Sequence, residues 1–189
     1  MSLYLAASSL IVTISILAII TFLHDKFALR LGKLLVLFYV IILTLVFHDP
    51  ISLFAGAILL IISEIDRREQ RIPDVFTKPA LFGLTVYFHD QFNLLLITWG
   101  WIALMYLVTL FLPKAIGRGD IKLIGALLLL NGHLQIQAHG RFLINLLFLS
   151  SALALPVAIA ARIRSGGKPF AFGPAIAGAW IWLVGLSLA

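Results

Sequence analysis

The sequence predicts an all-α membrane protein with about eight spanning helices and both termini on the non-cytoplasmic side. Three observations predict this fold class. The hydrophobic share of 62% and the mean hydropathy of +1.10 exceed what a soluble domain carries. The apolar residues gather into long runs, and the basic residues favour alternate connections between them. Because a spanning helix takes about 20 residues, we expect one integral membrane domain over residues 1–189.

The apolar runs define the predicted helices in chain order. They cover residues 3–23, 34–47, 51–65, 79–88, 92–112, 121–131, 142–161 and 174–188. Several runs are shorter than about 20 residues, which helix tilt and local bilayer thinning accommodate, and a chain of six spans is the alternative. The first run lacks a basic segment before it and an AxA-like cleavage site after it, so it predicts a spanning helix rather than a signal peptide.

The basic residues predict the orientation of these helices. The connections after the odd-numbered runs, together with the first turn of the run that follows, contain 13 of the 14 Lys and Arg residues, and Arg141 is the exception. Positive charge marks cytoplasmic connections, so four connections should face the cytoplasm and both termini should lie outside it. The 13 residues are Lys26, Arg30, Lys33, Arg67, Arg68, Arg71, Lys78, Lys114, Arg118, Lys122, Arg162, Arg164 and Lys168.

The composition excludes several kinds of chemistry. The chain has no cysteine, which rules out disulfides, thiol nucleophiles and cysteine-ligated zinc. Its five histidines lie at separate loop positions, without an i, i+4 pair or an HExxH pattern. The sequence therefore predicts no metal site.

Four carboxylates lie at or near the predicted cytoplasmic ends of apolar runs, namely Glu64, Asp66, Asp74 and Asp120. A carboxylate in such a place suggests an ion path, a proton relay or an acid–base site. Asp66 directly follows the third run and Asp120 directly precedes the sixth, so the fold could bring the two together at one membrane depth. The glycines before Asp120 allow a tight turn or the close approach of an extended chain. The same GxGD pattern also fits a simple turn with an acidic helix start.

Three segments resemble the motifs of the type IV prepilin peptidases, membrane aspartic proteases of the GxGD class. Asp66 followed by Ile72–Thr77 is similar to the family segment in which an aspartate precedes IPDxxT. The segment Gly117–Leu123 is similar to the family's GxGDxKL motif, and Lys168–Pro174 is similar to its KxxPFGP motif. Two positions depart from the pattern: Arg118 lies where family members often have an apolar residue, and Ala171 replaces the first proline of the third motif.

The resemblance implies an eight-helix membrane peptidase with Asp66 and Asp120 as its catalytic pair and with no metal or cofactor. Its partners would be the bilayer and a prepilin or pseudopilin precursor, cleaved at the cytoplasmic face of the bacterial inner membrane, with no nucleic acid. Such a precursor has a short basic leader, a glycine before the scissile bond and a long apolar helix after it. The residues implied to bind substrate or shape the loops are Pro73, Asp74, Gly117, Gly119, Lys122, Lys168, Phe172, Gly173 and Pro174.

One connection separates this chain from the two-function members of that family. Those members carry a cytoplasmic domain with paired CxxC motifs between the first and second helices, and they also methylate the new N-terminus. This chain has only the ten residues His24–Lys33 there. The resemblance therefore implies a peptidase-only form, without the zinc-binding or methyltransferase insertion.

Two acids near Asp66 have alternative interpretations. Asp74 is a rival for the first catalytic position, but Pro73 places it at a helix start, where an N-cap role is the simpler interpretation. We therefore expect Asp74→Asn to retain activity. Glu64 would either meet a basic leader or pair with a neighbouring arginine.

The chemistry of two carboxylates leaves further questions open. One carboxylate takes a proton from water while the other protonates the substrate carbonyl, which requires a raised pKa on one of them. Basic neighbours Arg67, Arg118 and Lys122 would oppose that rise, and the sequence does not decide the balance.

A small proton- or cation-coupled transporter and a non-enzymatic pilus or secretion assembly subunit are the competing functions.

Overall fold

The computed structural model describes residue 14 and residues 49–112, 116–135, 137–165 and 170–188. These residues form helices α3 (Pro50–Glu69), α4 (Asp74–Tyr87), α5 (Phe92–Phe111), α6 (Arg118–Leu134), α7 (His139–Ser165) and α8 (Gly173–Leu188). Each coincides with one of the last six apolar runs, so the predicted helices are confirmed there. Apart from residue 14, the first two runs lie outside the described residues, as do the connection His24–Lys33 and the motif residue Lys168.

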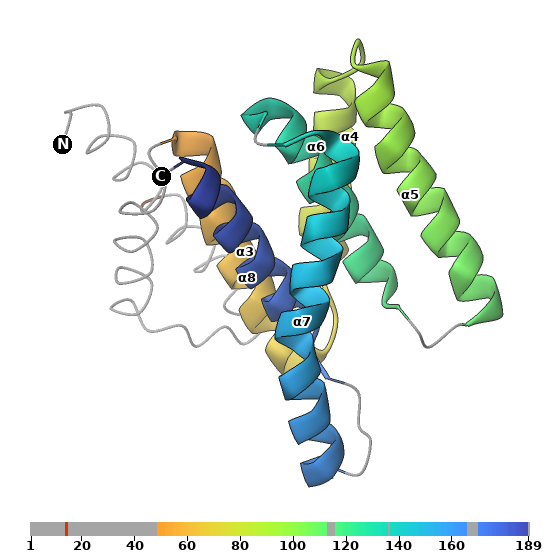
Figure 1. Ribbon diagram of the computed structural model, residues 1–189, viewed down its shortest axis with the longest axis vertical. Helices are drawn as coiled ribbons and strands as arrows, with labels where there is room; N and C mark the ends of the chain where they lie inside the picture. The colour runs from red at the N-terminus through yellow and green to blue at the C-terminus, as the bar shows by residue number, and fades with distance from the viewer. Residues whose placement is uncertain (1–13, 15–48, 113–115, 136, 166–169, 189) are drawn as a thin grey trace.

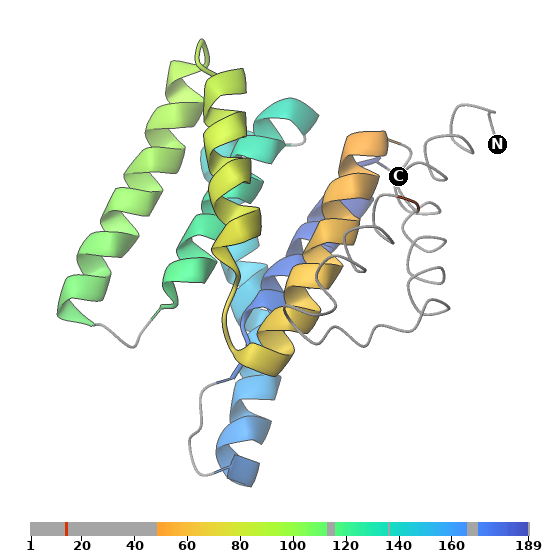
Figure 2. The same ribbon diagram turned by 180° about the vertical axis from the view of Figure 1, so that it is seen from behind.

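Helix α6 lies at the centre of the described helices. It packs against α4 and α5 on one side and against α7 and α8 on the other, while α3 packs along α8 (Figures 1 and 2). Every residue of α6 from Leu123 to Gly132 is buried. One apolar core joins α6 to α3, α7 and α8, and a second joins it to α4 and α5. Contacts on both sides of α6 therefore determine where its first turn lies.

Two of the described helices are long and apolar enough to cross a membrane, α5 and residues His139–Ala161 of α7, and Gly173–Leu186 of α8 is a shorter apolar helix. Large apolar side chains such as Leu110 and Phe111 are more than three-quarters exposed on α5. Regular structure that is entirely helical over the described residues, with such surfaces, suits a bilayer. The number of eight spans and the side of each terminus stay predictions.

Helix starts differ from the apolar runs by a few residues. Helix α4 begins at Asp74, five residues before its apolar run, and continues through Pro79. The residue before it, Pro73, has a φ of −68° in an extended conformation, which suits the entry to a first turn. Helix α3 begins after Asp49, whose side chain accepts a hydrogen bond of 2.7 Å from the Ser52 backbone N–H.

Candidate active site

Asp66 connects two of the three sequence motifs directly. It lies in the last turn of α3, and its side chain is only 4% exposed. Its Oδ2 accepts a hydrogen bond of 2.7 Å from the backbone N–H of Gly173, 107 residues later in the chain. The backbone N–H of Phe172 donates to the same carboxylate. The segment before α8 therefore forms part of the surroundings of Asp66.

Gly173 is required at this contact by its lack of a side chain. A Cβ atom on residue 173 would lie 2.9 Å from Asp66 Oδ2 and 3.1 Å from Asp66 Cβ, so the Asp66 side chain would have to shift. Pro174 follows in the first turn of α8, where a proline has no N–H to lose from the helix. Phe172 packs edge-to-face on Phe170, with ring centroids 6.3 Å apart. The third motif thus brings its backbone donors to Asp66.

Asp120 lies in the first turn of α6, three residues after the N-cap Gly117. Its carboxylate accepts a hydrogen bond from the Gly117 backbone N–H, as the third-position acid does in a capping box. A Cβ on Gly117 would lie 2.5 Å from Asp120 Oδ2, so a side chain there would displace the carboxylate. The interpretation of GxGD as an acidic helix start is therefore confirmed. The carboxylate also interacts with a distant acid.

Gly119 brings the start of α6 against the segment that follows α3. A Cβ on residue 119 would lie 2.7 Å from Ile72 Cβ and 3.3 Å from the Ile72 backbone nitrogen. Gly119 therefore allows a close approach of two backbone segments, and the segment that approaches it is the one at Ile72 of the same chain. Sequence reasoning missed Ile72 as a site residue. Its only signal was its position in the motif before Pro73 and Asp74.

The two carboxylates Asp66 and Asp120 interact electrostatically. Both lie outside the apolar runs, because the third run ends at residue 65 and the sixth begins at residue 121. Burial, followed by the negative charge of Asp66, raises the pKa of Asp120 to about 7, although the Gly117 hydrogen bond opposes the rise. Burial also raises the pKa of Asp66, opposed by the N–H groups of Gly173 and Phe172.

Burial therefore decides whether the pKa values of Asp66 and Asp120 rise, which the sequence left open. Of the basic neighbours, Arg67 bonds to Glu64 at 2.9 Å and Lys122 pairs with Asp74. Arg118 is exposed. Their charges do not offset the rise at Asp66 and Asp120, because the first two are directed to other carboxylates and the third faces solvent.

Asp74 occupies a different environment from Asp66. It is the first residue of α4, not its N-cap, so the predicted capping role is wrong and Pro73 holds that position. Its carboxylate pairs with Lys122 of α6 and, at 2.8 Å, with Lys78 one turn along α4. Lys122, followed by Lys78, holds the pKa of Asp74 below its usual range. Asp74 is thus an ionised partner of lysines.

Glu64 pairs with neighbouring arginines, as one of the two sequence interpretations held. Its carboxylate accepts two hydrogen bonds of 2.9 Å from Arg67 and another from Arg68. All three residues lie on the last turns of α3 at i, i+3 and i, i+4 spacing.

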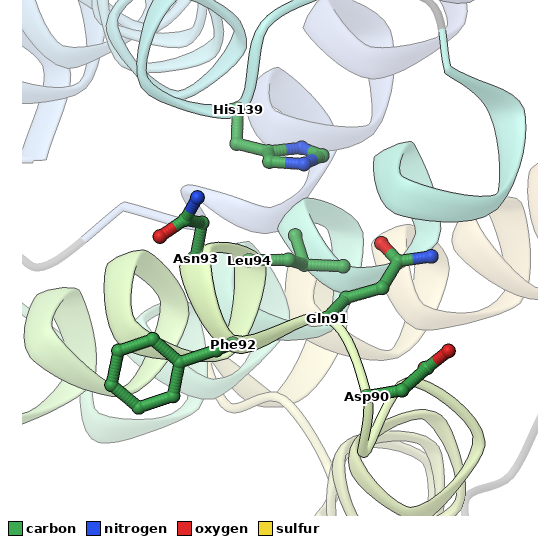
Figure 3. A pocket seen from close by; sticks show the side chains of 6 residues that line it. All are labelled: Asp90, Gln91, Phe92, Asn93, Leu94 and His139. Atoms are coloured by element: carbon green, nitrogen blue, oxygen red, sulfur yellow. The ribbon is translucent and has the colours of Figure 1, made fainter.

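The opposite end of the helices is polar but contains none of these carboxylates. A cavity of about 390 Å³ is lined there by residues of the α4–α5 turn, the start of α5 and the start of α7 (Figure 3). The lining residues are Asp90, Gln91, Phe92, Asn93, Leu94 and His139. Within the described ranges no three His, Asp or Glu residues are grouped so that they could hold a metal ion.

The comparisons with known proteins give one match. The model of the type IV leader peptidase family matches residues 53–159, which is more than half of the chain. The matched range contains Asp66 and Asp120, whereas the third motif lies beyond it. No match was found among curated proteins or among solved structures.

Proposed function

Because the chain belongs to the type IV leader peptidase family, we propose that Asp66 and Asp120 are the catalytic pair of a membrane aspartic endopeptidase. The protein removes the short basic leader of prepilin-like precursors at the cytoplasmic face of the bacterial inner membrane. The observation that carries the proposal is the electrostatic interaction between two partly desolvated carboxylates from motifs 54 residues apart in the chain.

The surroundings of the two acids support different roles for them. Asp66 accepts hydrogen bonds from two backbone N–H groups, which favour its ionised form as the general base. Asp120, with a pKa of about 7, keeps a proton near neutral pH and is the general acid. The negative charge on Asp66 maintains that difference.

The proposed hydrolysis uses one water molecule and one shared proton. Asp66 takes a proton from the water as its oxygen attacks the scissile carbonyl carbon, and Asp120 donates its proton to the carbonyl oxygen. The tetrahedral diol then collapses. Asp66 gives its proton to the leaving amide nitrogen as the carbon–nitrogen bond breaks, and Asp120 recovers a proton from a diol hydroxyl, which restores the starting state.

The competing functions fit these observations less well. A transporter relay needs its carboxylates near the middle of the membrane, whereas Asp66 and Asp120 lie at helix ends. An assembly subunit has no need of two interacting acids with a raised pKa. Co-expression with a prepilin-type precursor, followed by a gel that resolves loss of the leader, distinguishes the peptidase from both.

The eight-span topology gives a first testable prediction. Reporters fused within the four basic connections should report the cytoplasm, and reporters in the other connections should report the opposite side, because basic connections are retained inside. Two or more reversed positions would overturn this topology. The predicted cytoplasmic sites are Arg30, Thr77, Lys114 and Arg164, and the predicted outer sites are Asp49, Asp90, His139 and Ala189.

The short first connection gives a second prediction. A methyl-donor pocket typically encloses about 300–1,000 Å³, which the ten residues His24–Lys33 are too few to form. Mass spectrometry of a precursor processed by the purified protein with a methyl donor should therefore show loss of the leader and no added methyl group. Methylated product in that purified system would contradict the peptidase-only proposal, while methylation in cells alone would indicate a separate enzyme.

A further inference from the structure

Asp120 and Lys122 point to different sides of the first turn of α6. Residues two apart on a helix do not face each other, because each residue advances the helix by about 100°. Asp120 interacts with Asp66 at the end of α3, whereas Lys122 pairs with Asp74 at the start of α4. The first turn of α6 therefore lies between Asp66, which interacts with Asp120, and Asp74, which pairs with Lys122.

The Asp74–Lys122 pair is the directional contact on the α4 side of this turn. The nearby contact of Gly119 with Ile72 brings the backbones close but has no preferred direction. The N-cap residue Gly117 has no side chain to orient the helix. Lys122 is enclosed, with a side chain only 17% exposed, and its ammonium reaches the Asp74 carboxylate 48 residues away in sequence.

We propose that the Asp74–Lys122 pair is a positioning clamp, which helps to fix the rotation of the first turn of α6 and so keeps Asp120 within electrostatic range of Asp66. This inference rests on the proposed function, in which Asp120 acts beside Asp66. The two clamp residues act through α6 and take no part in proton transfer. Asp74→Asn should accordingly lower the activity without abolishing it, which departs from the expectation of retained activity drawn from the sequence.

The first test measures the geometry without any substrate. The natural chain has no cysteine, so a variant with Asp66→Cys and Asp120→Cys contains one possible disulfide. The rate at which mild oxidation of the purified full-length protein forms that disulfide reports how often the two positions meet. Adding Lys122→Met, or separately Asp74→Asn, should slow its formation about tenfold, because the first turn of α6 then loses its polar contact with the start of α4. An unchanged rate in both would overturn the clamp, whether or not the protein cleaves a precursor.

The matched control removes the other lysine that contacts Asp74. Lys78 bonds to Asp74 within α4 and is 66% exposed, so its pair does not join two helices. Lys78→Met should leave the disulfide rate unchanged. A slowing equal to that of Lys122→Met would show that any loss of charge near Asp74 suffices, and it would overturn the proposal.

The second test uses cleavage kinetics in the chain with both acids intact. A displacement of about 1 Å at a catalytic group lowers the rate by up to about 100-fold. Lys122→Met and Asp74→Asn should each lower kcat about 10- to 100-fold with little change in KM, and the double variant should be no worse than either, because both break one contact. Lys122→Arg should restore most of kcat.

The kinetic outcomes also distinguish this proposal from the proposed function. A natural protein that cleaves no precursor would overturn the peptidase assignment, while the disulfide rates would still decide the clamp. Normal kcat in Asp74→Asn combined with a raised KM in Lys122→Met would mean that Lys122 contacts the substrate directly, which overturns the clamp alone. Melting curves of every variant separate a loss of position from a loss of fold.

Discussion

Replacing Asp66 or Asp120 by asparagine should abolish leader cleavage while the protein still accumulates in the membrane. One remaining carboxylate cannot serve as base and acid in the same step, so we expect a loss of at least about 1,000-fold in each single variant. The double variant should be no worse, because residues that act as one unit give non-additive losses. The measurement is the fraction of co-expressed precursor that retains its leader, alongside the membrane content of each variant.

The control for this loss is the same exchange at the far end of the helices. Asp90 is an exposed aspartate beside the cavity of Figure 3, away from both acids. Asp90→Asn should therefore cleave at the natural rate. The pH profile of the natural protein adds a readout: because Asp120 must hold a proton, kcat should fall as pH rises through about 7. Undiminished cleavage by Asp120→Asn would eliminate the two-carboxylate mechanism.

Asp120→Asn should also make the protein more stable above neutral pH. The pKa of Asp120 is raised from 3.8 in an unfolded chain to about 7 in the fold, so the folded state holds its proton more tightly. Below about pH 4 the acid is protonated in both states and the exchange should have little effect. As pH rises from about 4 to about 7 the natural protein loses stability, and above that range the deficit approaches about 4 kcal/mol. Asparagine does not titrate and avoids this loss.

Thermal unfolding of the purified protein in detergent, at pH 5 and pH 8, measures this difference. At about 2–4 °C per kcal/mol for a chain of this size, Asp120→Asn should melt roughly 10 °C above the natural protein at pH 8 and far less above it at pH 5. Asp90→Asn should show neither shift. An equal gain at both values of pH would mean that the ionised carboxylate is not what destabilises the fold.

Most of the helices followed from the sequence because their signal is local. An apolar run long enough to form a helix is visible without knowledge of its neighbours, and the last six runs correspond to α3–α8. The differences fell at helix ends, where several helices extend three to five residues beyond their apolar runs. Helix α4 begins at Asp74 and not at the apolar run, because hydropathy does not register a polar first turn.

The acids were found from the sequence by their placement, whereas their relation required the fold. Asp66, Asp74 and Asp120 all flank apolar runs, and the motifs alone could not say which two interact. The structure pairs Asp74 with Lys122 and places Asp66 within electrostatic range of Asp120. Lys122 lies two residues from Asp120 in sequence, yet the turn of the helix directs it to the other side.

By itself the sequence determined the helical class, the positions of the described helices and the family, because these depend on local composition and on short motifs. Only the tertiary structure decided why Gly173 and Gly119 must be glycine, since the atoms that would clash with their side chains belong to Asp66 and Ile72. It also decided that Asp120 titrates near neutrality. Desolvation and charge–charge interaction depend on distances between residues far apart in the chain, and those distances exist only once the helices have packed.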